Sequence, residues 1–190
     1  MPTYDSFNGK KGSAIVEGKY VNESRAVKAA HVQPQDTNYH HTMFGGKLMS
    51  YIDDLAALSA VRHARKPVVT ASTDSVDFLC PIKEGASVCL ESFVTYTHKT
   101  SMEIFVKVIT EDLLTGERKL CATSFLTFVA LDEDGRPTTV PPVIPETEEE
   151  KMLYESAEGR RKIRNIRRED SRRFSEVFTI NQPWEKRDRV

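Results

Sequence analysis

Cysteine is scarce in this 190-residue chain, and its three cysteines lie far apart, at Cys80, Cys89 and Cys121. Because the number is odd and no two form a CxxC pair, a disulfide framework and a cysteine-rich zinc site are both disfavoured. Each cysteine sits in an apolar or strand-like run. We therefore expect three reduced thiols in the interior of a cytoplasmic protein.

Long hydrophobic runs are also missing, and no apolar stretch approaches the length of a membrane-spanning helix. The N-terminus lacks the basic-then-apolar pattern of a signal peptide. Charge of one sign does not dominate either, since 27 Lys and Arg face 28 Asp and Glu for a net charge of -1. These absences give no reason to expect a nucleic-acid or membrane partner, and they predict a soluble, cytoplasmic chain.

The length suffices for one domain with a core and an appendage. Residues 1–22 are polar and glycine-containing, so we expect an N-terminal arm that is flexible or ordered only against a neighbour. Residues 23–140 carry the regular patterns of a single domain. Residues 141–190 follow several prolines and are predicted to form a charged helix and a tail. The sparse aromatic residues Phe174, Phe178 and Trp184 suit docking on another surface.

One strong helical pattern runs from Gly45 to about His63, where apolar and small residues recur at three-to-four spacing. A strand pattern precedes it at residues 25–32, and four more follow at residues 68–79, 88–96, 102–108 and 120–131. The links between the last four are short enough for antiparallel neighbours. This order predicts an α+β fold with one long central helix wrapped by a curved five-stranded antiparallel sheet. A second copy is expected to cover the rest of so apolar a helix.

The chemistry is concentrated where the helix begins. A polar loop leads into it through Gly45 and Gly46, whose amides suit a carbonyl oxygen that becomes an oxyanion. The alternative is that these glycines only allow close packing. Asp53 falls at the edge of the apolar face, whereas Asp54 points nearly opposite. Asp53 is therefore the candidate general base, or less readily a nucleophile that forms a transient anhydride.

Gly45 and Asp53 cannot both contact one carbonyl if they belong to the same helix. Eight residues at about 1.5 Å rise separate them by roughly 12 Å along the axis. Two copies packed with antiparallel helices would bring the Gly45 end of one chain beside Asp53 of the other. The spacing therefore predicts an active site shared between two chains.

The run from Asn38 to Asp54 resembles the hotdog-fold acyl-CoA thioesterases, in particular the cytosolic acyl-CoA hydrolase group. Three further segments match that group in order, at residues 68–81, 99–101 and 125–137, so the resemblance covers roughly residues 25–165. It implies hydrolysis of acyl-CoA to free acid and CoA by a dimer with two composite sites, often assembled into a trimer of dimers. It implies no cofactor other than the CoA of the substrate.

The resemblance also assigns roles to single residues. Asn38 matches the catalytic asparagine of the group, which orients the water or hydrogen-bonds the thioester carbonyl, although a turn-forming asparagine is the alternative. Thr70 matches a third polar residue that holds water or the aspartate. His41 departs from the group, which usually has glycine there. That substitution leaves substrate size and pH response open.

A CoA-binding role is implied for a hairpin and, more weakly, for a basic cluster. Lys99, Thr100 and Ser101 match a basic residue followed by Thr-Ser, which would hold CoA phosphates, and a polar turn explains them about equally well. Arg160 and Arg164 belong to a basic helix end, following an acidic helix start at residues 146–150. They would reach the CoA of a neighbouring subunit, or would form an ordinary solvated helix end.

Other functions fit the pattern less well. His40 and His41 suggest a metal, but no third ligand follows at zinc spacing, and a serine triad lacks its GxSxG elbow. A non-catalytic acyl-CoA sensor on the same fold is the main alternative, since the basic helix could serve as its effector surface. A hydratase or dehydratase that pairs His41 with Asp53 is a third possibility, at a spacing that does not match.

Overall fold

The structure is a computed structural model and describes residues 17–181. Its elements follow in the order β1 (Lys19–Tyr20), α1 (Val21–Ser24), β2 (Ala26–His31), a 3-10 turn (Pro34–Asp36), α2 (Gly45–Ala64), β3 (Val68–Phe78), β4 (Ser87–Thr97), β5 (Ser101–Glu111), β6 (Arg118–Ala130), β7 (Val143–Ile144) and α3 (Glu148–Val177). The predicted helix and five strands are confirmed within a few residues at each end.

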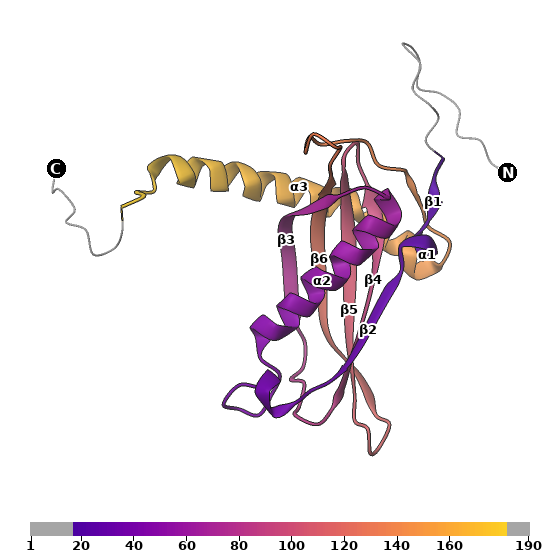
Figure 1. The fold of residues 1–190 in the computed structure, drawn as a ribbon, viewed down its shortest axis with the longest axis vertical. Coiled ribbons are helices and arrows are strands. Elements are labelled where there is room, and N and C mark those ends of the chain that lie inside the picture. The colour runs from indigo at the N-terminus through magenta and orange to yellow at the C-terminus, as the bar shows by residue number, and fades with distance from the viewer. Residues whose placement is uncertain (1–16, 182–190) are drawn as a thin grey trace, which may run out of the picture.

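Five antiparallel strands form one sheet in the order β2-β4-β5-β6-β3, and this sheet curves around α2 (Figure 1). The predicted α+β fold with one central helix is therefore confirmed. One link was misread: residues 83–85 do not join antiparallel neighbours. β3 pairs with β6, and the chain between β3 and β4 crosses to the other side of the sheet. As a result β3 is an edge strand.

The core lies between α2 and the inner face of the sheet. The helix buries Leu48, Ile52, Leu55, Ala56 and Ala60 almost completely. Burial of large apolar side chains supplies most of the favourable free energy of such a layer. The small residues on the same face let the helix axis approach the strands closely. The sheet therefore fixes the position of α2 and of both its ends.

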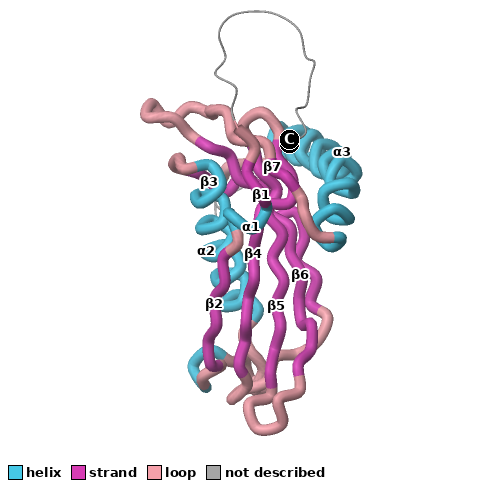
Figure 2. The backbone as a smooth tube through the Cα atoms, turned by 90° about the vertical axis from the view of Figure 1, so that its right-hand side faces the viewer, coloured by secondary structure: helices cyan, strands magenta, loops and turns pink. Residues whose placement is uncertain are grey.

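The other face of the sheet is covered by α3, so the two long helices lie on opposite sides of the strands (Figure 2). A buried carboxylate on β5 anchors α3: Glu103 is 2% exposed and accepts a hydrogen bond from Arg160 Nη2 at 2.7 Å. Further along, Arg164 and Arg167 both pair with Asp74 of β3, at 2.8 and 2.6 Å. These contacts lead α3 across the sheet to the β3 edge.

Two expectations are wrong in part. Residues 19–22 of the predicted arm belong to the folded body, because β1 pairs in parallel with β7 and Val21 is 1% exposed. The remainder of that arm, residues 1–16, lies outside the described residues, as does Trp184. Cys80 and Cys121 form a disulfide between the end of β3 and β6, whereas Cys89 is free. The strand order that places β3 beside β6 brings these two cysteines together, and spacing alone did not show it.

Candidate active site

The first turn of α2 has no side chain that caps it. Phe44 occupies the N-cap position in an extended conformation, and the first turn contains no acidic residue. Amides at the first helical positions have no acceptor inside their own helix. Gly45 and Gly46 therefore offer N–H groups at the positive end of the helix dipole, where an oxyanion is stabilised.

The loop before this turn is fixed by its backbone. The Met43 amide donates to the Ile82 carbonyl and the Phe44 amide to the Asp36 carbonyl, both at 2.8 Å. Lys47 forms an ion pair with Asp36 at 3.2 Å, and its hydrogen bond to Asp36 raises the pKa of Lys47. Because the loop is held at several points, the Gly45 and Gly46 amides keep a constant direction.

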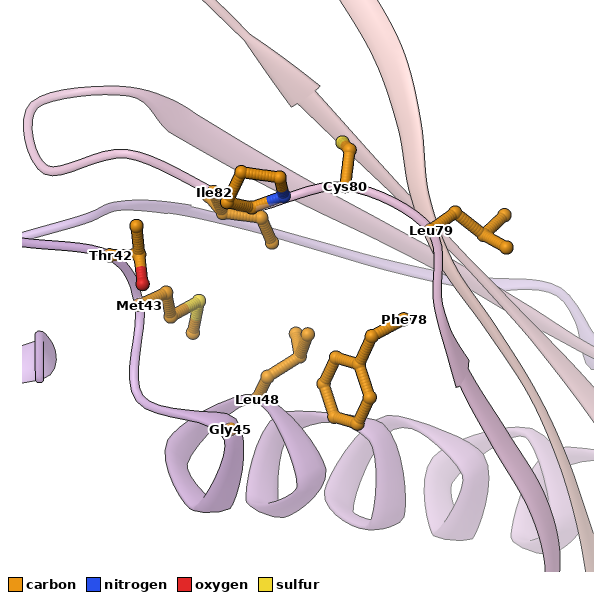
Figure 3. Close-up of a pocket in the computed structure, with 9 residues that line it drawn as sticks. Thr42, Met43, Gly45, Leu48, Phe78, Leu79, Cys80 and Ile82 are labelled. Carbon is orange, nitrogen blue, oxygen red and sulfur yellow. The ribbon is translucent and has the colours of Figure 1, made fainter. Parts of the chain in front are cut away.

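An apolar cavity of about 460 Å³ opens beside Gly45. Its walls come from the loop, the start of α2 and the chain that leaves β3, and they include Met43, Leu48, Phe78, Cys80 and Ile82. Figure 3 shows Phe78 and Leu48 reaching into the same space, next to Gly45. A Cβ atom at Gly45 would lie 3.7 Å from the Phe78 ring, so the aromatic side chain closes directly over the helix start.

Asp53 and Thr70 are brought together by the structure. Thr70 Oγ1 donates a hydrogen bond to Asp53 Oδ1 at 3.0 Å, which leaves Oδ2 open to a further partner. Both residues are exposed, one on α2 and the other on the edge strand β3. The adjacent carboxylate differs: Asp54 pairs with Lys28 of β2 at 2.8 Å. The two carboxylates therefore lie in different environments: Asp53 accepts from a threonine hydroxyl, whereas Asp54 is paired with a lysine.

Asn38 organises the loop in the single chain. Its Oδ1 accepts from the His40 amide at 2.9 Å, and its Nδ2 donates to Thr42 Oγ1 at 3.1 Å. His41 has a left-handed backbone, with φ of +56°, a conformation that favours glycine. The glycine that is usual at this position suits a left-handed backbone. Histidine adopts the same conformation here at some cost in free energy.

The predicted CoA-binding residues do not lie near Gly45 of the same chain. The Thr100 carbonyl accepts from Ala130, which pairs with Val68 at the start of β3, whereas the cavity beside Gly45 is at the other end of that strand. The ten residue steps from Val68 to Phe78 span about 33 Å in an extended strand. Lys99, Thr100 and Ser101 therefore sit at the opposite end of the sheet.

Arg160 and Arg164 are on the outer face of the sheet, away from α2. Both contact the buried Glu103, and Arg164 also pairs with Asp74. The structure does not bring them to the cavity or to Asp53. Their charge is matched within the chain by carboxylates that are 11% exposed or less, and a contact with the CoA of a neighbouring subunit stays a prediction.

Two kinds of site are not found in residues 17–181. Within that range no three His, Cys, Asp or Glu residues cluster in a way that would hold a metal ion. None of the helices in that range has the length and apolar character needed to cross a membrane.

Comparison with known proteins identifies the family. The sequence model of the thioesterase superfamily matches residues 40–117. A Bacillus subtilis protein described as an uncharacterized acyl-CoA thioester hydrolase is 56% identical over 168 residues, which are 88% of this chain and 98% of that protein. This chain belongs to the acyl-CoA thioester hydrolases of the thioesterase superfamily. The hydrolase family agrees with the resemblance drawn from the motifs.

Two further similarities place the chain within this family. The human cytosolic acyl coenzyme A thioester hydrolase is 36% identical over 68% of this chain, which spans 34% of the human protein. A solved acyl-CoA hydrolase of Staphylococcus aureus, in complex with butyryl coenzyme A, coenzyme A and coenzyme A disulfide, is 48% identical. It superposes with a TM-score of 0.80, over 83% of this chain and 96% of that chain. The hotdog fold is thus shared with an enzyme that binds CoA.

Sequence reasoning missed the cavity beside Gly45. Met43, Phe78 and Ile82 line it, yet none was a candidate, because apolar residues at a strand end resemble ordinary core. One signal was available in the sequence: Phe78, Leu79 and Cys80 form a short apolar run directly before Pro81, where the strand pattern ends. In the structure Phe78 and Leu79 are both more than half exposed. Exposed apolar side chains next to a glycine turn are typical of a ligand site.

Proposed function

We propose that this chain hydrolyses acyl-CoA thioesters to a free carboxylic acid and CoA, at a site shared by two copies. The observation that carries the proposal is the hydrogen bond from Thr70 to an exposed Asp53, together with an uncapped helix start that borders an apolar cavity. The acyl chain would occupy that cavity, with its carbonyl oxygen at the amides of Gly45 and Gly46. No metal or organic cofactor is required.

The second copy would join through β3. This strand is eleven residues long, and no strand among residues 17–181 pairs with its outer edge. Exposed edges of this length favour pairing with another strand. Antiparallel pairing about a two-fold axis places the start of one β3 beside the end of the other. Lys99, Thr100 and Ser101 of one chain then come to the end where Gly45 of its partner lies.

The chemistry would proceed through a water molecule held by Asp53. Oδ2 of Asp53 accepts a proton from the water while the water oxygen attacks the thioester carbon, and Thr70 keeps the carboxylate in place. The Gly45 and Gly46 amides stabilise the negative charge on the carbonyl oxygen. The carbon–sulfur bond then breaks, and CoA leaves as the thiolate, which takes up the proton held by Asp53 and restores the carboxylate. Asn38, at the loop before the helix, would orient the water or the carbonyl.

Solved variants of the Staphylococcus aureus hydrolase support this choice of residues. In separate variants an aspartate, an asparagine and a threonine are changed to alanine. In that enzyme the asparagine precedes the aspartate by 15 residues and the threonine follows it by 17. Asn38, Asp53 and Thr70 have the same spacing in this chain.

Relatives also support a larger assembly in the cytoplasm. A solved acyl-CoA thioesterase that is 51% identical to this chain, with a TM-score of 0.78, is hexameric, and the mammalian relatives are described as cytosolic. We extend both properties to this chain: a cytoplasmic trimer of dimers, with the β3 dimer as its unit.

The test of the catalytic role is Asp53→Ala, with Asp54→Ala as the matched control. Thiol release from acyl-CoA should fall by at least about 1000-fold in Asp53→Ala, as expected for the loss of a general base together with its orienting role. Asp54→Ala, which removes only the pair with Lys28, should retain most of the activity. Full turnover in Asp53→Ala would remove this residue from the mechanism. Binding of acyl-CoA without turnover by the unaltered chain would favour the sensor.

Sharing of the site is tested by mixing two inactive chains. Asn38→Ala and Asp53→Ala chains, unfolded together and refolded, should regain about a quarter of the unaltered activity, because half of the dimers are mixed and one of their two sites draws the intact residue from each chain. Verified mixed dimers that stay inactive would show that Asn38 and Asp53 act from the same chain.

A further inference from the structure

The second half of α3 extends past the edge of its own sheet. Figure 1 shows the helix passing β6 and β3 and continuing beyond β3, away from the body. The crossing point is fixed by Arg164 and Arg167, which both pair with Asp74 in β3. From Arg164 the helix runs about 24 Å back to Glu148 and about 20 Å on to Val177, at 1.5 Å per residue. The β3 edge therefore lies near its middle.

One side of α3 carries an exposed apolar stripe from Met152 to Val177, which polar residues, among them Asp170, interrupt. It consists of Met152, Ile163, Ile166, Phe174 and Val177, each more than half exposed. The successive spacings are 11, 3, 8 and 3 residues, which are close to whole numbers of helical turns. The five residues therefore lie on one side of the helix, about a quarter turn from the face that contacts the sheet. Gly159 lies on the same side, and a Cβ atom there would meet nothing within 4 Å. Such a stripe is typical of a helix that packs against another helix.

The charges of α3 are distributed unevenly along its length. Residues 148–158 contain five acids and one lysine, whereas residues 159–177 contain eight Lys and Arg and three acids, Glu169, Asp170 and Glu176. Two such helices attract more when antiparallel than when parallel, because the acidic start of each then faces the basic remainder of the other. The charge pattern thus matches a second copy of the same helix in reverse direction.

We infer that the apolar stripe of α3 packs against the same stripe of a second copy, as an antiparallel helix pair that spans the dimer on the outer face of the sheet. The inference rests on the β3 dimer of the proposed function. Pairing of the two β3 edges puts the two crossing points side by side, so each helix continues over the sheet of its partner. Ile163 and Ile166, next to the crossing point, would lie closest to the two-fold axis.

Cysteine crosslinking of the full-length chain tests this arrangement. Ile163→Cys and Ile166→Cys should be joined between chains by a short bis-maleimide more than about tenfold faster than Arg172→Cys, because pairing holds the two thiols at high effective concentration. Arg172 is exposed on the opposite side of the same helix and serves as the matched control. Unaltered protein, treated alike, reports any linking through native cysteines.

Thr73→Cys, at the exposed middle of β3, reports the strand pairing separately. If Thr73→Cys links while the stripe variants link no faster than Arg172→Cys, the helix pair is wrong and the β3 dimer stands. If none of the cysteine variants link and sedimentation shows a monomer, the β3 dimer is wrong as well. Thiol release measured on the same samples tests the activity independently of the assembly. A double variant, Thr73→Cys with Ile166→Cys, should give covalent dimers only. A ladder of larger species would assign the stripe to a contact between dimers and overturn the inference.

Discussion

The two long helices begin in opposite ways, on opposite faces of the same sheet. α3 starts with a complete capping box: the Glu150 amide donates to Thr147 Oγ1 at 3.2 Å, and Glu150 Oε2 accepts from the amides of Glu146 and Thr147. Burial opposes ionisation of Glu150, but these amides and the Arg25 guanidinium keep its pKa below its ordinary value. α2 starts at Phe44, with neither a side-chain cap nor an acid in its first turn.

We interpret the capped start of α3 as a stabilising feature and the uncapped start of α2 as a site for a ligand. A cap satisfies the free amides and typically stabilises a helix by about 1 kcal/mol. α2 forgoes that contribution, and its first residue, Gly45, lines an apolar cavity instead. Buried apolar contacts along its length compensate. An uncapped start on a well-packed helix therefore indicates function more strongly than a glycine pair does.

Among changes to the two long helices, the largest expected effect comes from giving α2 the cap that it lacks. Phe44→Asp would supply an acceptor and a negative charge to the Gly45–Lys47 turn, so kcat for thiol release should fall about 100- to 1000-fold, the range seen when an oxyanion donor is lost. Phe44→Leu, which also removes the ring but cannot cap, is the control and should retain far more activity. Relative to Phe44→Leu, Phe44→Asp should be more stable to urea by about 1 kcal/mol. Equal kcat in the two variants would remove these amides from the reaction.

Breaking the anchor of α3 should lower stability rather than chemistry. Arg160→Ala leaves the buried Glu103 without its closest charged partner, a change that costs about 3 kcal/mol in comparable buried pairs. Arg161→Ala is the control, because its neighbour pair with Glu158 lies at the surface, and it should have a much smaller effect. Urea unfolding measures both, at a fixed protein concentration since the chain is expected to assemble. A similar loss of unfolding free energy in the two variants would mean that Arg160 is not needed to stabilise the buried carboxylate of Glu103.

Much of the fold was accessible from the sequence because its elements carry strong local patterns. The spacing of Leu48, Ile52 and Leu55 predicted α2, and alternating apolar residues predicted the strands. Strand order was not accessible, since the link at residues 83–85 has the same turn residues as a hairpin, yet crosses the sheet. The disulfide was missed for the same reason, because it depends on which strands are neighbours.

The candidate site was predicted in its polar part and missed in its apolar part. Asp53 stood out as a carboxylate at the edge of an apolar helix face, whereas Thr70 was assigned only by the family resemblance, and the structure joins the two by a hydrogen bond. The contact between Arg160 and Glu103 was not predicted, because a basic cluster looks alike in sequence whether it faces solvent or a buried carboxylate on a distant strand. Nothing in the local pattern around Glu103 showed that it would be buried beneath α3.

The start of α3 offers a further contrast with that of α2. Thr147→Ala should destabilise the protein by about 1 kcal/mol, because the Glu150 amide loses its acceptor, Thr147 Oγ1. Thr147→Ser, which keeps the hydroxyl, should be close to the unaltered chain. Thiol release per site should not change in either variant, since this cap lies on the far face of the sheet. A loss of kcat that follows the loss of stability would connect the two helix starts in a way that the fold does not explain.

The smallest expected effect concerns the strained loop in front of α2. His41 holds a left-handed backbone with φ of +56°, and its side chain is 83% exposed. His41→Gly should stabilise the protein by about 0.5–1 kcal/mol, because glycine adopts this conformation without steric cost, although it loses more conformational freedom on folding. His40→Gly is the matched control: it changes the neighbouring exposed histidine, whose φ is not positive, and should destabilise slightly. If urea unfolding shows the same change in free energy in both variants, the left-handed backbone at His41 is not a source of strain in the loop before α2.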